Sequence, residues 1–297
     1  MQSQYVIIAG RLGTRFEGDA LATVTSTGTS LYYEQHGHGP DIVWVSGGGG
    51  LPESTWMRYQ LPDFPGFRST VFHNRGIGRT VCTDELPWTM ADFARDTAAL
   101  IEAACEPPVI VVGKSMGALI TQQLALDRPD LVQLAIPMGT LARSTGWVHD
   151  YMRAEIDYRK AGGSLSGLFA VCHYAATLNP ADELGDPEVW EALKLQYAGF
   201  GATEDNQNER SLIGQWDACD TFDCVDALRG CTVPMHVVAF GQDVQSPPQY
   251  GREVAELAPA GVLHLLPDHG HASLWSPKRA GEVNSLIHEI IEREGQR

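Results

Sequence analysis

The stretch Val109–Ala118, which reads VIVVGKSMGA, constrains the fold most strongly because two incompatible motifs overlap in it. The letters GKS match the end of a phosphate-binding loop, G-x-x-x-x-G-K-[ST], whereas GKSMG matches G-x-S-x-G, the turn that exposes a nucleophilic serine. A phosphate-binding loop needs a glycine five residues before Gly113, but that position is Pro108. The residues between them, Val, Ile, Val and Val, favour a strand over a flexible loop. The stretch therefore predicts a strand, a sharp turn at Ser115 and a helix.

The turn at Ser115 needs small neighbours because a serine in this position has a strained backbone. Gly113 and Gly117, on either side of the serine, have no side chains that would collide at the sharp turn. Ala118 is small enough to let the helix pack closely. The serine would also lie at a helix N-terminus, where the macrodipole favours developing negative charge. These features make Ser115 the candidate nucleophile.

A serine hydroxyl needs a base to remove its proton, and that base needs an acid to orient it. In folds with this turn, the acid and the histidine follow the serine in that order along the chain. Asp243 follows the apolar run Met235–Phe240, which predicts a loop position at the end of a strand. An acid after the preceding strand is the alternative, but no carboxylate lies between Leu131 and Val148. Asp243 is therefore the candidate acid.

The candidate base follows the next apolar run, Gly261–Leu266. The loop after it holds two histidines, His269 and His271. A glycine directly before the base is typical of this turn, and Gly270 precedes His271. The sequence therefore favours His271 over His269.

Hydrolysis of an acyl group also needs two backbone N–H groups that stabilise the oxyanion. One is predicted from Met116, directly after the nucleophile. The other is predicted from the loop SGGGGLPESTW, whose glycines let the main chain approach a substrate closely. Gly48 is the candidate donor in that loop, with Gly49 as the alternative.

The order of predicted elements indicates an α/β protein. From Leu21 on, short β-like runs alternate with helical ones, such as the helix predicted over Met90–Cys105, and this alternation favours a largely parallel sheet with helices on both faces. Between about Gly139 and Thr221 the strand pattern is replaced by helical, aromatic-rich sequence. We therefore predict an N-terminal extension at 1–20, a core at 21–140 and 222–297, and a helical cap inserted at 141–221.

Composition excludes several classes of partner. The formal charge is −16, which argues against nucleic acid and anionic membrane surfaces and leaves a small-molecule substrate. No apolar run approaches the roughly 18–20 residues of a membrane span, and the N-terminus does not match a signal peptide, so we expect a cytoplasmic protein. The six cysteines form no C-x-x-C pair, so we expect free, buried thiols. The oligomeric state is not predictable from these features.

Taken together, these motifs resemble those of the α/β-hydrolase superfamily. Besides the serine turn, FHNRGIGRT is similar to the D-x-R-G-x-G-x-S segment of that family, whose arginine turn braces the sheet, although His73 and Thr80 depart from it. Ser46 departs at the position where many members carry histidine before the oxyanion donor. The resemblance implies the α/β-hydrolase fold, with a mostly parallel twisted sheet and an inserted helical cap. It also implies a Ser115–Asp243–His271 triad that needs no metal or organic cofactor.

The expected reaction is two-step acyl transfer on an ester or thioester of a small, partly apolar molecule, such as a secondary metabolite. The triad leaves open carbon–carbon bond hydrolysis, aminopeptidase action, acyl transfer or cyclisation. A ligand-binding receptor or pseudoenzyme of the same fold is the non-enzyme alternative. For Lys114, which the turn does not require, a solvent-facing side chain is the simplest expectation; tuning the site or binding an acidic substrate are the alternatives.

Overall fold

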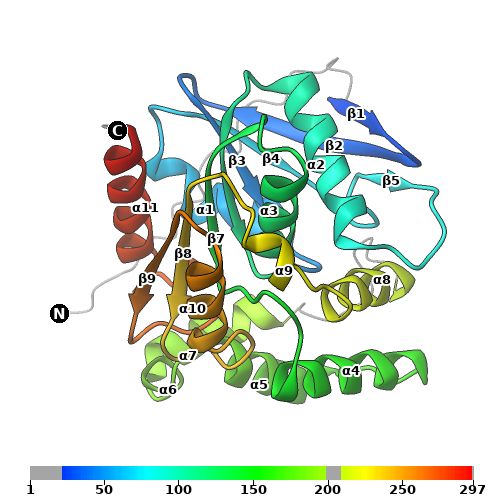
Figure 1. The fold of residues 1–297 in the computed structure, drawn as a ribbon. Helices are drawn as coiled ribbons and strands as arrows, with labels where there is room; N and C mark the ends of the chain where they lie inside the picture. Colours follow the sequence, from blue (N-terminus) through cyan, green and yellow to red (C-terminus); the bar gives the residue numbers. More distant parts are fainter. Residues whose placement is uncertain (1–21, 199–208, 296–297) are drawn as a thin grey trace, which may run out of the picture.

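The structure is a computed structural model that describes residues 22–198 and 209–295, and the N-terminal extension predicted at 1–20 lies outside them. The described residues form a nine-stranded sheet with helices on both faces (Figure 1), which confirms the predicted fold class. The strands are β1 (Thr23–Ser26), β2 (Thr29–His36), β3 (Asp41–Val45), β4 (Arg68–Phe72), β5 (Val81–Cys82), β6 (Val109–Lys114), β7 (Val132–Met138), β8 (Met235–Phe240) and β9 (Gly261–Leu266).

The strand order is β1-β2-β4-β3-β6-β7-β8-β9, with β5 beside β2. From β4 to β9 neighbouring strands are parallel, whereas β2 is antiparallel to β1, β4 and β5. The predicted hairpin is the β1–β2 pair, and Gly28 in its turn has φ +64°, a conformation that glycine adopts easily. The sequence analysis does not predict strand β5, because two residues are too few to show the alternation of apolar and polar side chains that indicates a strand.

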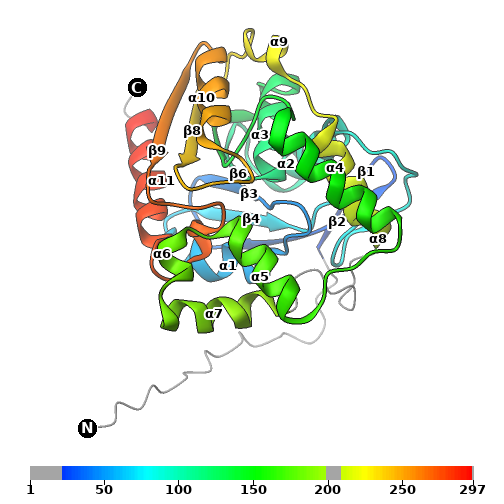
Figure 2. The ribbon, with the colours of Figure 1, turned by 90° about the horizontal axis from the view of Figure 1, so that it is seen from below.

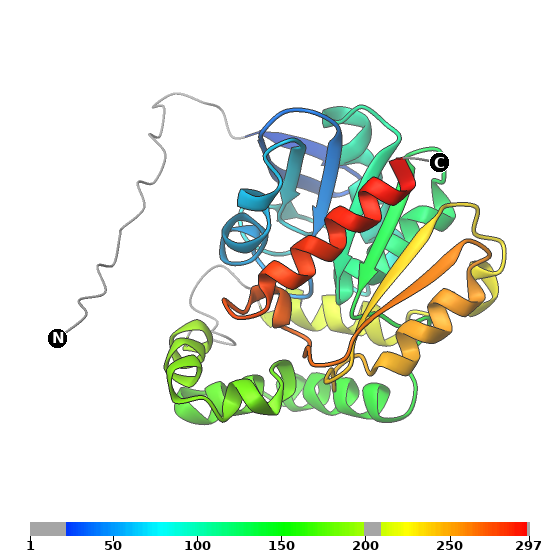
Figure 3. The ribbon, with the colours of Figure 1, turned by 90° about the vertical axis from the view of Figure 1, so that its left-hand side faces the viewer.

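Alternate residues of the central strands face the two layers of helices. Val43 and Val45 pack in one core with helices α2, α3 and α10, whereas Ile42 and Trp44 pack in the other with α1 and α11. Figure 3 shows α11 crossing this second face of the sheet. The helices are α1 (Trp56–Tyr59), α2 (Met90–Ala104), α3 (Met116–Asp127), α4 (Gly146–Lys160), α5 (Gly167–Leu178), α6 (Ala181–Leu184), α7 (Pro187–Tyr197), α8 (Glu209–Asp220), α9 (Val225–Leu228), α10 (Pro248–Leu257) and α11 (Ala280–Gly295).

Helices α4 to α8 occupy the chain between β7 and β8, where a helical cap is predicted. They lie along the edge where the parallel strands end (Figures 1 and 2). Residues 199–208, between α7 and α8, lie outside the described residues. In open α/β sheets, ligands bind at this carboxyl edge, so these helices lie next to the candidate site.

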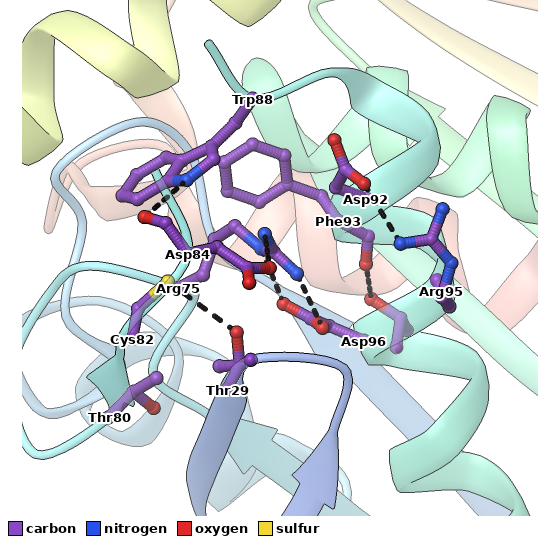
Figure 4. Close-up of polar contacts among 12 residues, drawn as sticks. Thr29, Arg75, Thr80, Cys82, Asp84, Trp88, Asp92, Phe93, Arg95 and Asp96 are labelled. Carbon is purple, nitrogen blue, oxygen red and sulfur yellow. Dashed lines mark hydrogen bonds and ion pairs between the residues drawn. The ribbon is translucent and has the colours of Figure 1, made fainter. Parts of the chain in front are cut away.

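The turn after β4 is tied to α2 by Arg75, whose side chain is fully buried. Its Nε and Nη2 atoms donate to the Asp96 carboxylate at 2.8 and 2.9 Å, and Nη1 donates to Asp84 at 3.1 Å (Figure 4). The guanidinium also lies against the rings of Trp88 and Phe93. This buried ion pair therefore holds the turn that follows β4 against helix α2.

We expect Asp96→Asn to destabilise the protein by about 3 kcal/mol, because removing one partner of a buried pair leaves the other charge uncompensated. The matched control is Arg95→Gln on the same helix, whose pair with Asp92 is exposed and worth about 1 kcal/mol or less. Urea unfolding of both variants measures the difference. Equal losses from the two variants would contradict a structural role for the buried pair.

Candidate active site

Ser115 occupies the sharp turn between β6 and α3, with φ 57° and ψ −122°. Among the described residues it is the one non-glycine residue with positive φ. Its backbone N–H donates to the Met138 carbonyl oxygen at 3.0 Å, which fixes the turn to the neighbouring strand β7. Strain of this kind is typical of functional sites, where the surrounding structure maintains it.

The glycines around Ser115 are required by close backbone contacts. A Cβ atom on Gly113 would lie 2.1 Å from the Gly117 carbonyl oxygen, and one on Gly117 would lie 2.1 Å from the Val45 carbonyl oxygen. A Cβ on Gly47 would lie 3.3 Å from the Ser115 Cβ, so the glycine-rich loop after β3 runs directly beside the candidate nucleophile. The turn, the helix and this loop are therefore packed without room for side chains.

Asp243 and His271 form a buried pair at the ends of β8 and β9. The His271 Nδ1–H donates to Asp243 Oδ2 at 2.6 Å, while Asp243 Oδ1 accepts the backbone N–H groups of Gln245 and Ser246 at 2.8 Å each. Because the carboxylate only accepts, it fixes the proton on Nδ1 and leaves the Nε2 lone pair as the basic group. Nε2 is buried and has no hydrogen-bond partner among the described residues.

His269, the alternative base, has different neighbours. Its Nε2 lies 3.5 Å from Glu282 Oε2 on α11, and its ring stacks on Phe240. Of the two histidines, it is therefore His271 that the structure pairs with Asp243.

Ser115 and His271 line one cavity of about 460 Å³. The glycine-rich loop and the carboxyl ends of the strands form one side of it, and helices α4, α5, α7 and α8 contribute the remaining walls. No hydrogen bond joins the Ser115 hydroxyl to His271 in the described structure, and such bonds are often long without a substrate. The apolar lining includes Leu119, Leu141, Val148, Met152, Leu178 and Leu212.

The two predicted oxyanion donors, Gly48 and Met116, also line this cavity. Neither backbone N–H has a hydrogen-bond partner within residues 22–198 and 209–295, and that of Met116 lies in the first turn of α3, where N–H groups have no helical partner. The Gly49 N–H donates instead to Gln215 Oε1 at 2.8 Å. This geometry favours Gly48 over Gly49 as the donor.

Gln215 on α8 holds the glycine-rich loop in place, and the sequence analysis did not identify this residue. Its Oε1 accepts the Gly49 N–H, while its Nε2 donates to the Arg75 carbonyl oxygen at 2.9 Å. A glutamine inside a helical segment has no sequence signal for such a role. At the start of the loop, the Ser46 Oγ accepts a hydrogen bond from Trp56 Nε1 at 3.1 Å.

The expectation that Lys114 faces solvent is wrong. Only 3% of its side chain is exposed, because β6 lies between β3 and β7 with helices covering both faces. Lys114 lines the cavity, and its Nζ lies 4.5 Å from the centre of the Trp275 ring. Burial lowers the pKa of Lys114 to about 7, although the Asp243 charge opposes this change.

Within the described residues, no group of three or more histidine, cysteine or acidic side chains is arranged to hold a metal ion. All six cysteines are unpaired; Cys219, Cys224 and Cys231 are buried as expected, whereas Cys172 is exposed. No helix in the same residues is long and apolar enough to span a membrane.

The amino-acid sequence of the chain is similar to those of known proteins. A model of the alpha/beta hydrolase family matches residues 42–283. The chain is 32% identical over 266 residues to a Mycobacterium tuberculosis protein named "Putative non-heme bromoperoxidase BpoC", covering 87% of this chain and 96% of that one. It is 28% identical to the "Putative carbamate hydrolase RutD" of Variovorax paradoxus, covering 89% and 96% of the two chains.

Solved structures show the same similarity. The crystal structure of the Mycobacterium tuberculosis protein superimposes with a TM-score of 0.80 at 30% identity, over 89% of this chain and 96% of that one. An enol-lactonase from Burkholderia xenovorans superimposes with a TM-score of 0.78 at 19% identity, over 91% and 100% of the two chains. At that identity, the second similarity shows the fold alone.

We expect Gly117→Ala to destabilise the protein by more than about 2 kcal/mol or to prevent its folding, because the new methyl group would collide with the backbone of β3. Gly281→Ala on α11 is the matched control: its Cβ meets nothing within 4 Å, so the exchange should be neutral or slightly stabilising. Chemical denaturation measures both. A folded Gly117→Ala protein of normal stability would show that this contact relaxes easily.

Proposed function

The chain belongs to the alpha/beta hydrolase family, and from that premise we propose that it is a serine hydrolase that cleaves a carboxylic ester or thioester. The observation that carries this proposal is the Asp243–His271 pair, whose histidine lines the same cavity as the strained Ser115 and whose Nε2 has no hydrogen-bond partner in the described part of the chain. A base held in this way accepts the proton of a serine hydroxyl as the hydroxyl attacks a carbonyl.

In the first step, Ser115 Oγ attacks the substrate carbonyl carbon and His271 Nε2 takes the hydroxyl proton. The oxyanion accepts hydrogen bonds from the Gly48 and Met116 N–H groups, with the N-terminus of α3 adding favourable electrostatics. Collapse of the tetrahedral intermediate breaks the bond to the leaving alcohol or thiol. His271 returns its proton to that leaving group, and the acyl group remains on Ser115.

In the second step, water replaces the leaving group. His271 removes a proton from the water, whose oxygen attacks the acyl carbonyl, and the same two N–H groups stabilise the second oxyanion. The ester bond to Ser115 then breaks, and His271 returns the proton to the serine oxygen. Asp243 stays ionised and supports the transient imidazolium throughout.

The cavity supports a small, partly apolar substrate, because its volume fits a small ligand and aliphatic side chains supply much of its lining. Helices α4 to α8 would act as a cap that excludes water from the acyl-enzyme. The name of the carbamate hydrolase relative refers to an acyl compound, which agrees with this proposal. A secondary metabolite remains the class of substrate that we propose.

The same triad supports carbon–carbon bond hydrolysis, aminopeptidase action or acyl transfer, and a ligand-binding protein of this fold needs no chemistry at all. An ester panel with added alcohol or amine acceptors separates hydrolysis from transfer by its products. Turnover of a vinylogous 1,5-diketone without turnover of any ester would instead favour carbon–carbon bond hydrolysis.

We expect a fluorophosphonate probe to label the folded protein on Ser115, because the probe reacts with a serine activated by a neighbouring base. Mass spectrometry should locate the label there, and Ser115→Ala should remove both the label and the turnover of p-nitrophenyl esters. Ser54→Ala, which changes another serine of the same cavity, is the matched control and should still be labelled. Equal labelling of Ser115→Ala would contradict the proposal that Ser115 is the nucleophile.

The pH dependence should reflect the burial of His271. Burial lowers the pKa of its imidazole below the usual value of 6.5, the Lys114 charge lowers it further, and the Asp243 charge opposes both. Because only neutral His271 accepts a proton, kcat/KM should be lost as the pH falls through this lowered pKa. We therefore expect the acidic limb below pH 6.5, measured with p-nitrophenyl butyrate from about pH 4.5 to pH 9. Circular dichroism at each pH controls for unfolding, and a limb above pH 6.5 contradicts the assignment.

A further inference from the structure

Lys114 is a cavity residue that the acyl-transfer steps do not use. It directly precedes Ser115, and its side chain passes beside the glycine-rich loop, where its Cδ lies 3.9 Å from the Cβ position of Gly47. Its Nζ then reaches the face of the Trp275 ring, and both residues line the cavity that contains Ser115. The ammonium is therefore placed within the candidate active site.

The other charged residues lining the cavity already have partners. Arg159 contacts the Glu155 carboxylate at 3.5 Å and that of Glu209 at 3.3 Å. Lys114 differs from them, because no hydrogen bond or ion pair joins its Nζ to another residue in the described part of the chain. The side chain is nonetheless 97% buried, since only 3% is exposed.

A buried ammonium without a counter-charge is costly, because burial removes its hydration. Asp243 acts on Lys114 only through its charge, and both of its carboxylate oxygens are occupied by His271 and two backbone N–H groups. The contact with Trp275 offsets part of the cost as a cation–π interaction. Within residues 22–198 and 209–295, no oxygen atom accepts a hydrogen bond from Lys114 Nζ.

Trp275 positions the ammonium through the face of its ring, which lies 4.5 Å from Lys114 Nζ. Both residues line the cavity that contains Ser115. The indole Nε1–H is fully covered by other atoms, so it is not a donor that a ligand in the cavity reaches. Lys114 is therefore the group through which this part of the cavity would bind an acceptor.

We propose that Lys114, assisted by Trp275, binds a carboxylate of the substrate, so that the ester cleaved at Ser115 carries an acidic group close to its scissile carbonyl. This inference rests on the proposed serine hydrolase function and narrows its substrate class. A carboxylate supplies both the opposite charge and the hydrogen-bond acceptor that the ammonium lacks. A specific cation is also needed to admit an anion into a chain of net charge −16.

The test compares pairs of substrates that differ only in this charge: p-nitrophenyl half-esters of succinic, glutaric and adipic acid, and the same compounds with the free carboxylate methylated. Three chain lengths vary the distance from the carbonyl to the charge. The readout is the ratio of kcat/KM for the anionic and the neutral member of each pair. This ratio cancels any general loss of activity.

We expect the wild-type protein to prefer the anionic member of at least one pair, and Lys114→Met, which keeps the length but removes the charge, to lower that ratio about tenfold or more. Lys194→Met is the control for non-specific attraction, because Lys194 is paired with Glu191 on α7, and it should keep the wild-type ratio. A wild-type preference for every neutral ester overturns the inference, whatever the variants do. A preference that Lys114→Met retains overturns it as well.

A binding measurement separates this inference from the proposed function. Ser115→Ala protein should bind monomethyl glutarate more tightly than dimethyl glutarate in calorimetry, and adding Lys114→Met should abolish the difference. If the wild-type protein cleaves no ester while this difference is found, the hydrolase proposal fails and the carboxylate site holds. If esters are cleaved and no difference is found, the carboxylate site fails alone. Should Lys114→Met not fold, Lys114→Gln takes its place in both measurements.

Discussion

The rest of the site depends on the backbone of Ser115, which is held in a conformation that serine rarely adopts. The conformation persists because Gly113, Gly117 and the strand β3 pack against one another with no space for side chains. That packing directs the serine away from the sheet and places the first N–H of α3 beside it. It also sets where the glycine-rich loop passes, and thereby where the candidate oxyanion donors lie.

The same edge of the sheet brings together groups that are far apart in the chain. Parallel strands end at one edge, so the loops after β3, β6, β8 and β9 bring together the candidate oxyanion donors, nucleophile, acid and base. The glycine after β7, Gly139, adopts φ +55°, and a Cβ atom there would approach Asp243 and His271 at 3.2 and 3.3 Å. The ends of β6, β8 and β9 therefore each carry one residue of the candidate triad, and the glycine at the end of β7 leaves room for two of them.

Much of this was predictable because the constraints are local. The serine turn, the order of the triad residues and the alternation of strands and helices leave short-range signals in the sequence, and strands such as β8 and β9 have the predicted bounds. Lys114 and Gln215 left no such signal. Solvent exposure of Lys114 was the wrong expectation because a strand's pattern does not reveal what covers it, and Gln215 acts through residues 140 and 166 positions away. Long-range packing of this kind has no counterpart in a single sequence.

Gln215 has a consequence for any movement of α8. It belongs to α8, in the helical segment between β7 and β8, yet its two hydrogen bonds attach it to the Gly49 N–H and the Arg75 carbonyl of the core. Moving α8 away would break the hydrogen bond to Gly49, which directly follows the candidate oxyanion donor Gly48. Helix α8 is thus part of the wall of the candidate active site and also supports the glycine-rich loop beside Ser115.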